Sequence, residues 1–295
     1  MEMREELVQR TREVEQIVEK FLPEEDGYQK TVLEAMNYSV RAGGKRLRPM
    51  LMQETYRLFG GSGEEIEPFM AAIEMIHTSS LIHDDLPCMD NDQLRRGLPT
   101  AWVKFGYDMA VLAGDALLIY AVETAAKAFS MTEHADRVGR SIGLLAEKTG
   151  IYGMIGGQVV DVELTDKPIP EEKLDFIYRL KTGALLEASM MIGAVLAGAE
   201  EKELKKVEEM ASAIGLAFQI QDDILDVTST EEQLGKPVLS DEKNHKTTYV
   251  TLAGLDQARI DVAEISEKAV SLLHEIPGSN PFLENLIYML INREN

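Results

Sequence analysis

Six aspartates stand in two clusters, and each cluster follows an apolar stretch with the residue types of a helix. The first cluster contains Asp84, Asp85 and Asp90, and the second contains Asp222, Asp223 and Asp226. Ionised carboxylates beside apolar surface are costly unless a neighbouring group compensates their charge. Asp222 and Asp226 are spaced i, i+4, so they share a helix face on which like charges repel. This spacing indicates a shared cation. Carboxylates without histidine or thiolate partners favour a hard ion such as Mg²⁺, which characteristically binds one or two carboxylates together with phosphates and water.

Pro87 interrupts the first cluster. Regular helical spacing would place Asp90 about 240° around the helix from Asp84. Because proline ends or distorts a helix, we expect the chain to let Asp90 swing back toward Asp84. The alternative is that both clusters are solvated helix ends in an acidic chain. Two clusters, each framed by apolar helix, favour the cation site.

Basic residues are few, and several gather in Arg41–Pro49, where Gly43 and Gly44 precede Lys45 and Arg48. Lys45 and Arg48, at i, i+3, can face one anion, and the paired glycines allow close backbone approach. The segment does not have the G-x-x-x-x-G-K-[ST] spacing of a nucleotide-binding loop. Further basic residues follow along the chain, near the acidic clusters: Arg95, Arg96, Lys181, Lys236 and Lys246. This interleaving indicates two anion sites, one bridged by a metal ion and one held directly by side chains.

The elements that must position these residues are helices. Apolar residues recur every three or four positions in eight segments, while alternating β-branched runs are scarce. The segments are 5–22, 28–42, 64–83, 107–129, 134–150, 171–198, 201–226 and 256–274. No long linker or fixed repeat divides the sequence. We therefore predict one all-α domain over residues 1–295, with long, mostly antiparallel helices around one core.

Composition excludes several classes of function. The 295 residues include 30 Lys+Arg and 51 Asp+Glu, which gives a formal net charge of −21 and argues against nucleic acid and anionic lipid as partners. The single cysteine, Cys88, excludes an internal disulfide and a multi-thiolate metal site. The charged N-terminus is unlike a secretory signal. The apolar stretch 183–199 is interrupted by Glu187, so we expect a buried helix there rather than a membrane span. The expected location is the cytoplasm.

The motifs, taken together, resemble those of the short-chain trans-prenyl diphosphate synthases. The matching stretches run in family order along almost the whole chain, and the pairing of DDxxxxD with a later DDxxD is specific. They are AGGKRLRP (42–49), EMIHTSSLIHDDLPCMDNDQLRRG (74–97), AGDALL (113–118), GGQVVD (156–161), KTGALL (181–186), FQIQDDILD (218–226), LGK (234–236) and HKTTY (245–249).

The resemblance implies an isoprenoid-synthase bundle around a deep central cavity, with the two acidic helices facing each other at its mouth. It assigns the six aspartates to several Mg²⁺ ions that hold an allylic diphosphate. Four basic residues would assist them: Arg95, Lys181, Lys236 and Lys246. Isopentenyl diphosphate would bind Lys45, Arg48, His77 and Arg96. The Lys181 carbonyl, the Thr182 hydroxyl and the Gln219 amide would face the carbocation. Gln158 and Asp161 are left out of this expected site.

The function implied by the resemblance is head-to-tail condensation of isopentenyl diphosphate with dimethylallyl, geranyl or farnesyl diphosphate, giving geranylgeranyl or farnesyl diphosphate. The steps are Mg²⁺-assisted ionisation, condensation and elimination. One alternative is a class I terpene cyclase, which shares a DDxxD motif but does not use a second diphosphate site at Lys45 and Arg48. Another is a non-catalytic subunit of a heteromeric synthase, although such subunits lose aspartates. The resemblance also implies a homodimer.

Product length depends on what blocks the cavity below the first cluster. Ser79 and Ser80 lie about one helical turn before Asp84. Bacterial farnesyl-type relatives often carry an aromatic residue at the position of Ser79, which closes the bottom of the cavity and acts as its floor. A serine there favours geranylgeranyl diphosphate. Farnesyl diphosphate remains the alternative, because deeper residues can block instead: Met50, Tyr120 or Met154.

Overall fold

The computed structural model describes residues 3–228 and 247–291, which are helical apart from one short hairpin and the connecting loops. In the N-terminal half the elements are α1 (Met3–Lys20), α2 (Lys30–Arg41), α3 (Leu47–Leu58), α4 (Glu67–Asp84), β1 (Leu94–Arg95), β2 (Leu98–Pro99), α5 (Ala101–Phe105), α6 (Tyr107–Ala126), η1 (Lys127–Ser130) and α7 (Ala135–Thr149). They continue as α8 (Met154–Glu163), α9 (Glu171–Ile177), η2 (Tyr178–Gly183), α10 (Ala184–Ala197), α11 (Glu201–Thr228), α14 (Tyr249–Ala253), α15 (Leu255–His274) and α16 (Pro281–Ile291).

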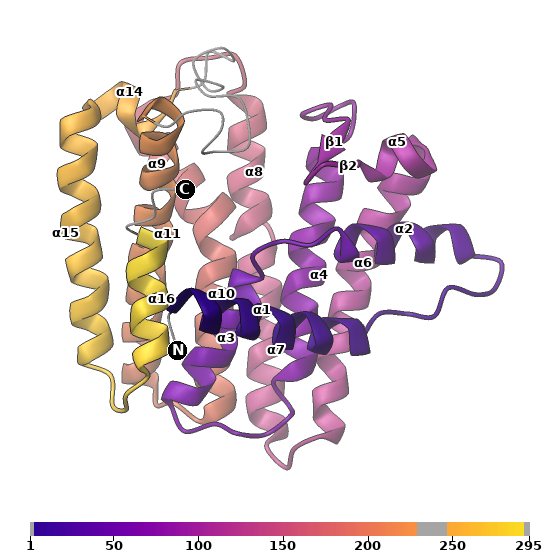
Figure 1. Cartoon of the computed structure of the whole chain (residues 1–295), viewed down its shortest axis with the longest axis horizontal. Coiled ribbons are helices and arrows are strands. Elements are labelled where there is room, and N and C mark those ends of the chain that lie inside the picture. Colours follow the sequence, from indigo (N-terminus) through magenta and orange to yellow (C-terminus); the bar gives the residue numbers. More distant parts are fainter. Residues whose placement is uncertain (1–2, 229–246, 292–295) are drawn as a thin grey trace.

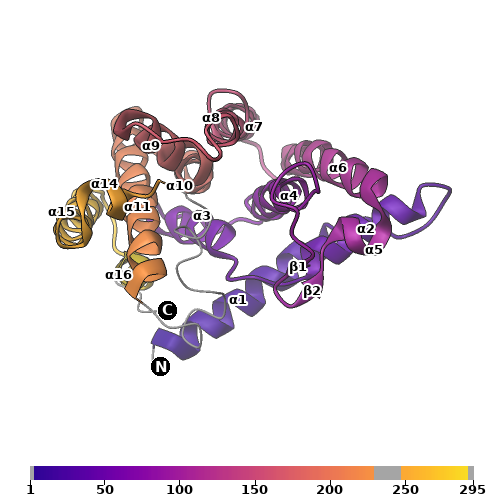
Figure 2. The same cartoon turned by 90° about the horizontal axis from the view of Figure 1, so that it is seen from above.

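The long helices run roughly side by side, and α1 and α2 cross them (Figure 1). Figure 2, seen from above, shows α4, α6, α7, α8 and α15 nearly end on. The principal packing pairs are α4 with α6, α11 with α15, and α10 with α3 and α11. Each long helix thus buries its apolar face against neighbours, which is the bundle that the sequence predicts.

The helix α10 is buried on all sides, as its composition predicts. Its only acid, Glu187, accepts a hydrogen bond from the Lys148 ammonium on α7 at 2.5 Å. Because a buried carboxylate is expensive without a partner, this pair explains how Glu187 is tolerated within the apolar stretch. By length and composition two helical stretches are apolar enough to cross a membrane, Tyr107–Ser130 and Glu171–Ala197. The second is mostly buried in the protein, whereas the first leaves an apolar face outward.

Five of the described helices were absent from the sequence prediction, two of which, α5 and α14, have only five residues each. The three longer ones are α3, α8 and α16, which lie at 47–58, 154–163 and 281–291. Each begins beside a proline or a glycine pair, residues that signal loops when a sequence is read locally. Packing of their apolar faces on the core overrides that signal. The prediction of long helices in the remaining segments is confirmed, with boundaries shifted by a few residues.

The end of α4 presents the first acidic cluster. The helix ends at Asp84, before Pro87, and the chain turns so that the Asp90 backbone N–H donates to the Asp84 carbonyl at 2.8 Å. The antiparallel hairpin β1–β2 follows, and pairs Arg95 with Leu98. The predicted return of Asp90 to Asp84 is therefore confirmed. The hairpin and α14 lie at the same end of the molecule, uppermost in Figure 1.

A π-helical turn, η2, separates α9 from α10. Such turns interrupt the regular helical hydrogen bonds and occur frequently at functional sites. This one contains Lys181 and Thr182. Gly157 on α8 packs against it so closely that a Cβ there would lie 2.3 Å from the Lys181 backbone nitrogen. Any larger residue at 157 would therefore push α8 away from the turn.

Candidate active site

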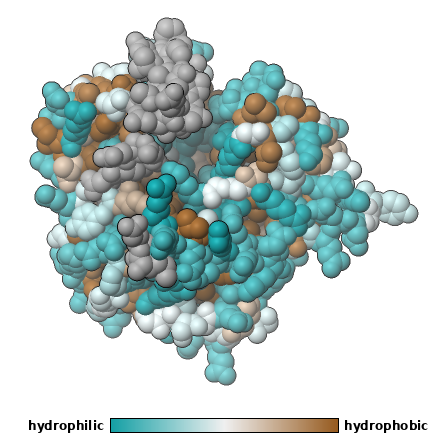
Figure 3. All heavy atoms as spheres, in the orientation of Figure 1, coloured by the Kyte–Doolittle hydropathy of each residue, from teal (hydrophilic) through white to brown (hydrophobic). Residues whose placement is uncertain are grey.

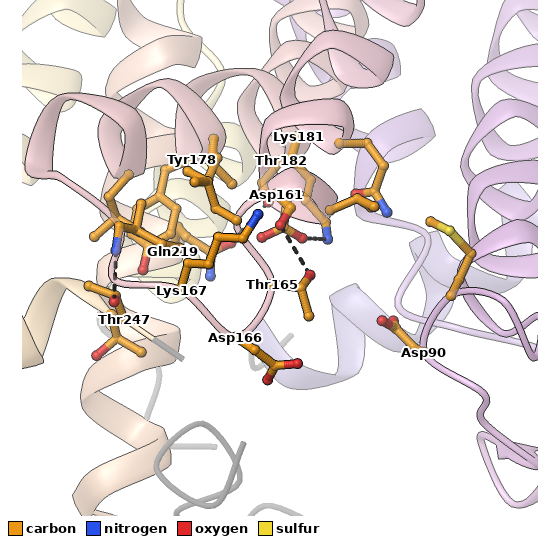
Figure 4. A pocket seen from close by; sticks show the side chains of 18 of the residues that line it. Asp90, Asp161, Thr165, Asp166, Lys167, Tyr178, Lys181, Thr182, Gln219 and Thr247 are labelled. Atoms are coloured by element: carbon orange, nitrogen blue, oxygen red, sulfur yellow. Dashed lines mark hydrogen bonds and ion pairs between the residues drawn. The ribbon is translucent and has the colours of Figure 1, made fainter. Parts of the chain in front are cut away.

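A cavity of about 840 Å³ opens at the end of the bundle that carries the acidic clusters. Its lining comes from the loop after α4, from α8 and the loop that follows it, from η2, from α11 and from the segment before α14. Figure 4 shows Asp90 on one side of this cavity, and Tyr178, Gln219 and Thr247 on the other. The structure therefore brings segments that are more than 150 residues apart in sequence to one space.

Asp84 is the centre of the first cluster. Burial raises its pKa to about 6; Asp90 adds to the rise, and Lys181 opposes it. The Gln158 amide of α8 donates to Asp84 Oδ1 at 2.7 Å. A carboxylate whose charge is opposed by burial and by another carboxylate is one that a bound cation would stabilise.

Lys181 and Thr182 project from η2 into the cavity. The Lys181 ammonium donates to Asp161 Oδ2 on α8 at 2.5 Å (Figure 4). Thr182 Oγ1 donates to Gln219 Oε1 on α11 at 2.9 Å. The three residues predicted to face the carbocation are thus neighbours across two elements, and the oxygen atoms of Thr182 and Gln219 are held together.

The second acidic cluster is only partly turned to this cavity. Asp223 lines the cavity and is buried. Asp226 is also buried and Asp222 is half-buried, but neither is among the described residues that line the cavity. Lys236 and Lys246, two of the predicted diphosphate-binding residues, lie outside the described residues.

Arg95 pairs with Asp85 in this structure. Its guanidinium donates to both carboxylate oxygens, from Nε at 2.8 and 2.9 Å and from Nη2 to Oδ1 at 2.6 Å. Burial raises the pKa of Asp85, although Arg95 opposes this rise. The side chain predicted to hold the allylic diphosphate is therefore engaged by one of the predicted metal ligands.

A second, basic pocket of about 490 Å³ lies where the loop before α3 meets α4. All four residues predicted for isopentenyl diphosphate line it: Lys45, Arg48, His77 and Arg96. Arg46 also reaches this pocket, but its guanidinium is buried and pairs with Glu74 at 2.7 Å. Arg46 therefore anchors the loop and leaves the other basic side chains to face the pocket.

The electrostatics of this pocket favour an anion. Burial, followed by the charge of Arg48 and then of Arg96, holds the pKa of His77 well below its usual value. Arg48 Nε is buried without a hydrogen-bond partner. Unpaired buried donors are costly, so an anion that accepts from Arg48 would be bound favourably.

Gly44 makes room for this basic pocket. Its φ is +136°, and a Cβ would lie 2.7 Å from Nη2 of Arg96. The glycine pair of the sequence motif is therefore required by the backbone conformation and by the close approach of Arg96.

The donor set suits Mg²⁺. Over residues 3–228 and 247–291 no three Asp, Glu, His or Cys side chains converge on a position that could hold a metal ion. Mg²⁺ does not need such a cage, because it commonly uses one or two carboxylates and completes its shell with phosphate oxygens and water. Asp84 and Asp90, which are close enough to raise the pKa of Asp84, offer those carboxylates.

Comparison with known proteins identifies the family. The model of the polyprenyl synthetase family matches residues 29–274. The chain belongs to the polyprenyl synthetase family. A geranylgeranyl diphosphate synthase of Cyanophora paradoxa is 45% identical over 269 residues, which cover 89% of this chain and 88% of that protein. A farnesyl diphosphate synthase of Geobacillus stearothermophilus is 47% identical over 235 residues, covering 78% of this chain and 77% of the relative.

A solved structure agrees with this family membership. A geranyltransferase from Helicobacter pylori, complexed with magnesium and isoprenyl diphosphate, superposes with a TM-score of 0.82 at 31% sequence identity. The match covers 99% of this chain and 97% of the other. The predictions of an isoprenoid-synthase fold and of a trans-prenyltransferase of the short-chain prenyl diphosphate synthase type are confirmed.

Within this polyprenyl synthetase, sequence reasoning missed three side chains that the structure places at the cavity. They are Gln158, Asp161 and Tyr178, which contact Asp84, Lys181 and Asp223. Gln158 and Asp161 are spaced i, i+3 and so share a helix face, which was the available signal. Tyr178 gave no local signal, because its partner is 45 residues away.

Proposed function

We propose that this chain condenses isopentenyl diphosphate with an allylic diphosphate and that its main product is geranylgeranyl diphosphate. One observation carries the proposal: α4 joins two different anion sites. His77 lines the basic pocket, and Asp84, on the same helix, belongs to the acidic cluster. They are seven positions apart, so they share one helix face and lie about 10 Å apart along the axis. Two diphosphates held at these places would have their chains side by side.

The basic pocket binds the diphosphate of isopentenyl diphosphate directly. Lys45, Arg48, His77 and Arg96 surround it, and charge-assisted hydrogen bonds from guanidinium groups suit phosphate oxygens. The low pKa of His77 keeps it neutral, so it donates one N–H without adding charge.

The acidic cavity binds the allylic diphosphate. Aspartates of the two clusters would hold several Mg²⁺ ions, and Arg95, Lys181, Lys236 and Lys246 would contact the diphosphate. When bound, Mg²⁺ neutralises the leaving diphosphate and so favours ionisation of the allylic C–O bond. Lys181 is already charged and turned into the cavity. Arg95, in contrast, donates to Asp85 and has to divide its hydrogen bonds between Asp85 and the diphosphate.

Residues of η2 and α11 stabilise the carbocation. The Lys181 carbonyl, Thr182 Oγ1 and the Gln219 amide oxygen present partial negative charge, and preorganised dipoles are the strongest means of stabilising a charge that develops during reaction. The double bond of isopentenyl diphosphate then attacks the carbocation. The proton lost on elimination passes to the departed diphosphate.

Chain length follows from Ser79. It is buried on α4, and Ser80 is half-buried beside it. A small residue at 79 leaves space for a growing chain where an aromatic ring would stop it. Met50, Tyr120 and Met154, on α3, α6 and α8, are the candidates for a deeper floor.

Two other functions are less well supported. A class I terpene cyclase does not need the basic pocket around Arg48. A non-catalytic subunit does not need intact acidic clusters, and all six aspartates are present.

We further propose that the enzyme is a homodimer located in the cytoplasm. Support for the dimer comes from α6, where Leu112, Ile119 and Val122 lie along one face and are 48%, 70% and 43% exposed. This helix lies on the side of the molecule turned away from the viewer in Figure 3, whose visible face is mostly hydrophilic (Figures 2 and 3). A contiguous apolar stripe of this kind marks an interface. The expected result of sedimentation analysis is a dimer that Ile119→Arg converts to monomer.

The test of the function is direct. The purified protein is incubated with Mg²⁺, isopentenyl diphosphate and each allylic diphosphate in turn, and the products are sized by chromatography. We expect geranylgeranyl diphosphate as the main product, and no turnover by Asp84→Ala or Asp222→Ala although both variants keep the helical circular dichroism spectrum. Failure to condense any allylic primer would overturn the proposal, and an active Asp84→Ala or Asp222→Ala would refute the assignment of that cluster.

A further inference from the structure

The carboxylate of Asp223 is held at a buried junction of three segments. One oxygen, Oδ2, accepts a hydrogen bond from the Tyr178 hydroxyl at 2.6 Å and another from the Tyr249 backbone N–H at 2.8 Å. The Tyr249 N–H also approaches the Tyr178 hydroxyl oxygen at 3.3 Å. Tyr178 and Asp223 are only 7% and 4% exposed. The contacts therefore join η2, α11 and the start of α14.

Further hydrogen bonds extend this junction on both sides. The Tyr249 hydroxyl donates to Asp261 Oδ2 on α15 at 2.7 Å. Thr248 caps α14 through a reciprocal pair of hydrogen bonds with Thr251. Thr247 Oγ1 accepts from the Ile169 backbone N–H at 3.2 Å, across the cavity loop (Figure 4). Asp223 thus connects a network that reaches from the loop after α8 to α15.

Apolar packing reinforces the same contact. Tyr178 belongs to a small buried cluster with Ile169, Leu174 and Ile177, and Tyr249 packs against that cluster. This cluster is separate from the main core. Small satellite clusters bury little apolar area, so hydrogen bonds to a buried carboxylate contribute a larger share of their stability.

We propose that Asp223 is a positioning residue, which fixes η2 and the start of α14 at the cavity, and that it does not ligate the metal. The resemblance assigned all three aspartates of the second cluster to Mg²⁺, and this inference, which rests on the proposed function, separates Asp223 from Asp222 and Asp226. A carboxylate oxygen has two lone pairs in its plane. Both lone pairs of Asp223 Oδ2 are already used by donors that the fold holds in place.

The helical geometry supports this division of roles. Asp222 and Asp226 are four residues apart and share a face of α11, whereas Asp223 is rotated by about 100° from Asp222. On that other face it meets Tyr178 and the start of α14. Asp223 thus contacts the protein on a face of α11 that Asp222 and Asp226 do not share.

The consequence for the reaction concerns Lys181 and Thr182. They follow Tyr178 by three and four residues, within the same π-helical turn. A π turn is less regular than an α-helix and needs support from its neighbours. Asp223 supplies that support by holding Tyr178, so that the ammonium of Lys181 and the oxygen of Thr182 keep their places in the cavity.

The experiment compares Asp223→Asn and Tyr178→Phe with Asp222→Asn in the full-length protein. Asparagine at 223 keeps an acceptor oxygen for Tyr178 and Tyr249 but removes the charge that a metal ligand needs. We expect Asp223→Asn to lose no more than about tenfold in kcat, with an unchanged Mg²⁺ concentration for half-maximal activity. Replacing a true ligand costs more, so Asp222→Asn should lose at least about a hundredfold. A loss in Asp223→Asn as large as that in Asp222→Asn, with a shifted Mg²⁺ requirement, would overturn the proposal.

A second measurement does not depend on activity. Amide hydrogen exchange of peptides covering residues 247–253 reports the Tyr249 N–H directly. We expect about tenfold faster exchange in Tyr178→Phe and in Asp223→Leu, because each removes a partner of this junction. The matched control is Tyr152→Phe, which changes an exposed tyrosine away from the cavity lining. Unchanged exchange in both junction variants refutes the positioning role, whereas inactivity of the wild-type protein would contradict only the proposed function.

Discussion

The ammonium of Lys181 lies 2.5 Å from Oδ2 of Asp161, across the gap between η2 and α8. Burial opposes the charge of Lys181, but Asp161, followed by Asp84 and Asp90, outweighs burial and raises the pKa of Lys181. The lysine is therefore held charged and oriented before any anion is bound. Asp161 accordingly acts on the reaction through Lys181.

Asp161→Asn should weaken catalysis by this route. Without the carboxylate Lys181 loses its orienting partner, and partners of this kind typically contribute about 10–100-fold to activity or affinity. We expect a loss of that size in kcat/KM for the allylic diphosphate, measured by steady-state kinetics. Asp166→Asn is the control, since Asp166 lines the same cavity and has no ion pair with Lys181. Equal losses in the two variants would show that only the charge of the cavity matters.

Gln158→Leu should raise the Mg²⁺ requirement. The Gln158 amide fixes Asp84 Oδ1 at 2.7 Å, and leucine keeps the size of the side chain but cannot donate. We expect the Mg²⁺ concentration for half-maximal activity to rise by about tenfold, measured by titration of the rate. Glu163→Gln, at an exposed position of the same helix, should leave that concentration unchanged. An unaltered Mg²⁺ titration in Gln158→Leu contradicts this role.

Gly44→Ala should impair binding of isopentenyl diphosphate. The added methyl group would collide with the Arg96 guanidinium at 2.7 Å and push it from the basic pocket. We expect KM for isopentenyl diphosphate to rise at least about tenfold, because one charge-assisted hydrogen bond is lost. KM for the allylic diphosphate should stay constant. Gly43→Ala is a matched control, because Gly43 also has a positive φ but a Cβ there meets no atom within 4 Å. A similar rise in Gly43→Ala would point to backbone strain instead of Arg96.

Ser79→Tyr should shorten the product. Ser79 is buried on α4, 3% exposed, about one turn before the acidic cluster. A tyrosine ring there would occupy space that a longer chain needs. We expect farnesyl diphosphate to replace geranylgeranyl diphosphate in product analysis, and Ser79→Ala to leave the product length unchanged. If Ser79→Tyr keeps the original product, the floor lies deeper, at Met50, Tyr120 or Met154.

Lys148→Met should strongly destabilise the fold. It leaves Glu187 buried on α10 without its ammonium partner, and breaking a buried pair in this way costs about 3–5 kcal/mol. The free energy of unfolding is measured by urea denaturation. Arg140→Met is the control on the same helix, because its pair with Glu201 is exposed and such pairs contribute about 0–1 kcal/mol. The double variant Lys148→Met, Glu187→Leu should recover part of the loss, and no recovery would show that packing alone is responsible.

The sequence alone was sufficient for the fold class and for most of the site. Helical periodicity is local, so it predicted the long helices, and the acidic and basic motifs are contiguous, so they could be recognised without knowing their neighbours. The return of Asp90 to Asp84 was also predictable, because Pro87 acts on the backbone beside it. These features depend on interactions between residues close in sequence.

Tertiary structure decided which groups each motif residue contacts. The sequence treats Asp222, Asp223 and Asp226 alike, but folding places Asp223 against Tyr178 and Tyr249, 45 and 26 residues away. The pairing of Lys181 with Asp161 and of Asp84 with Gln158 likewise requires α8 to pack on η2 and α4. The physical reason is that burial, hydrogen-bond partners and pKa values arise from groups brought together by packing, which local sequence does not encode.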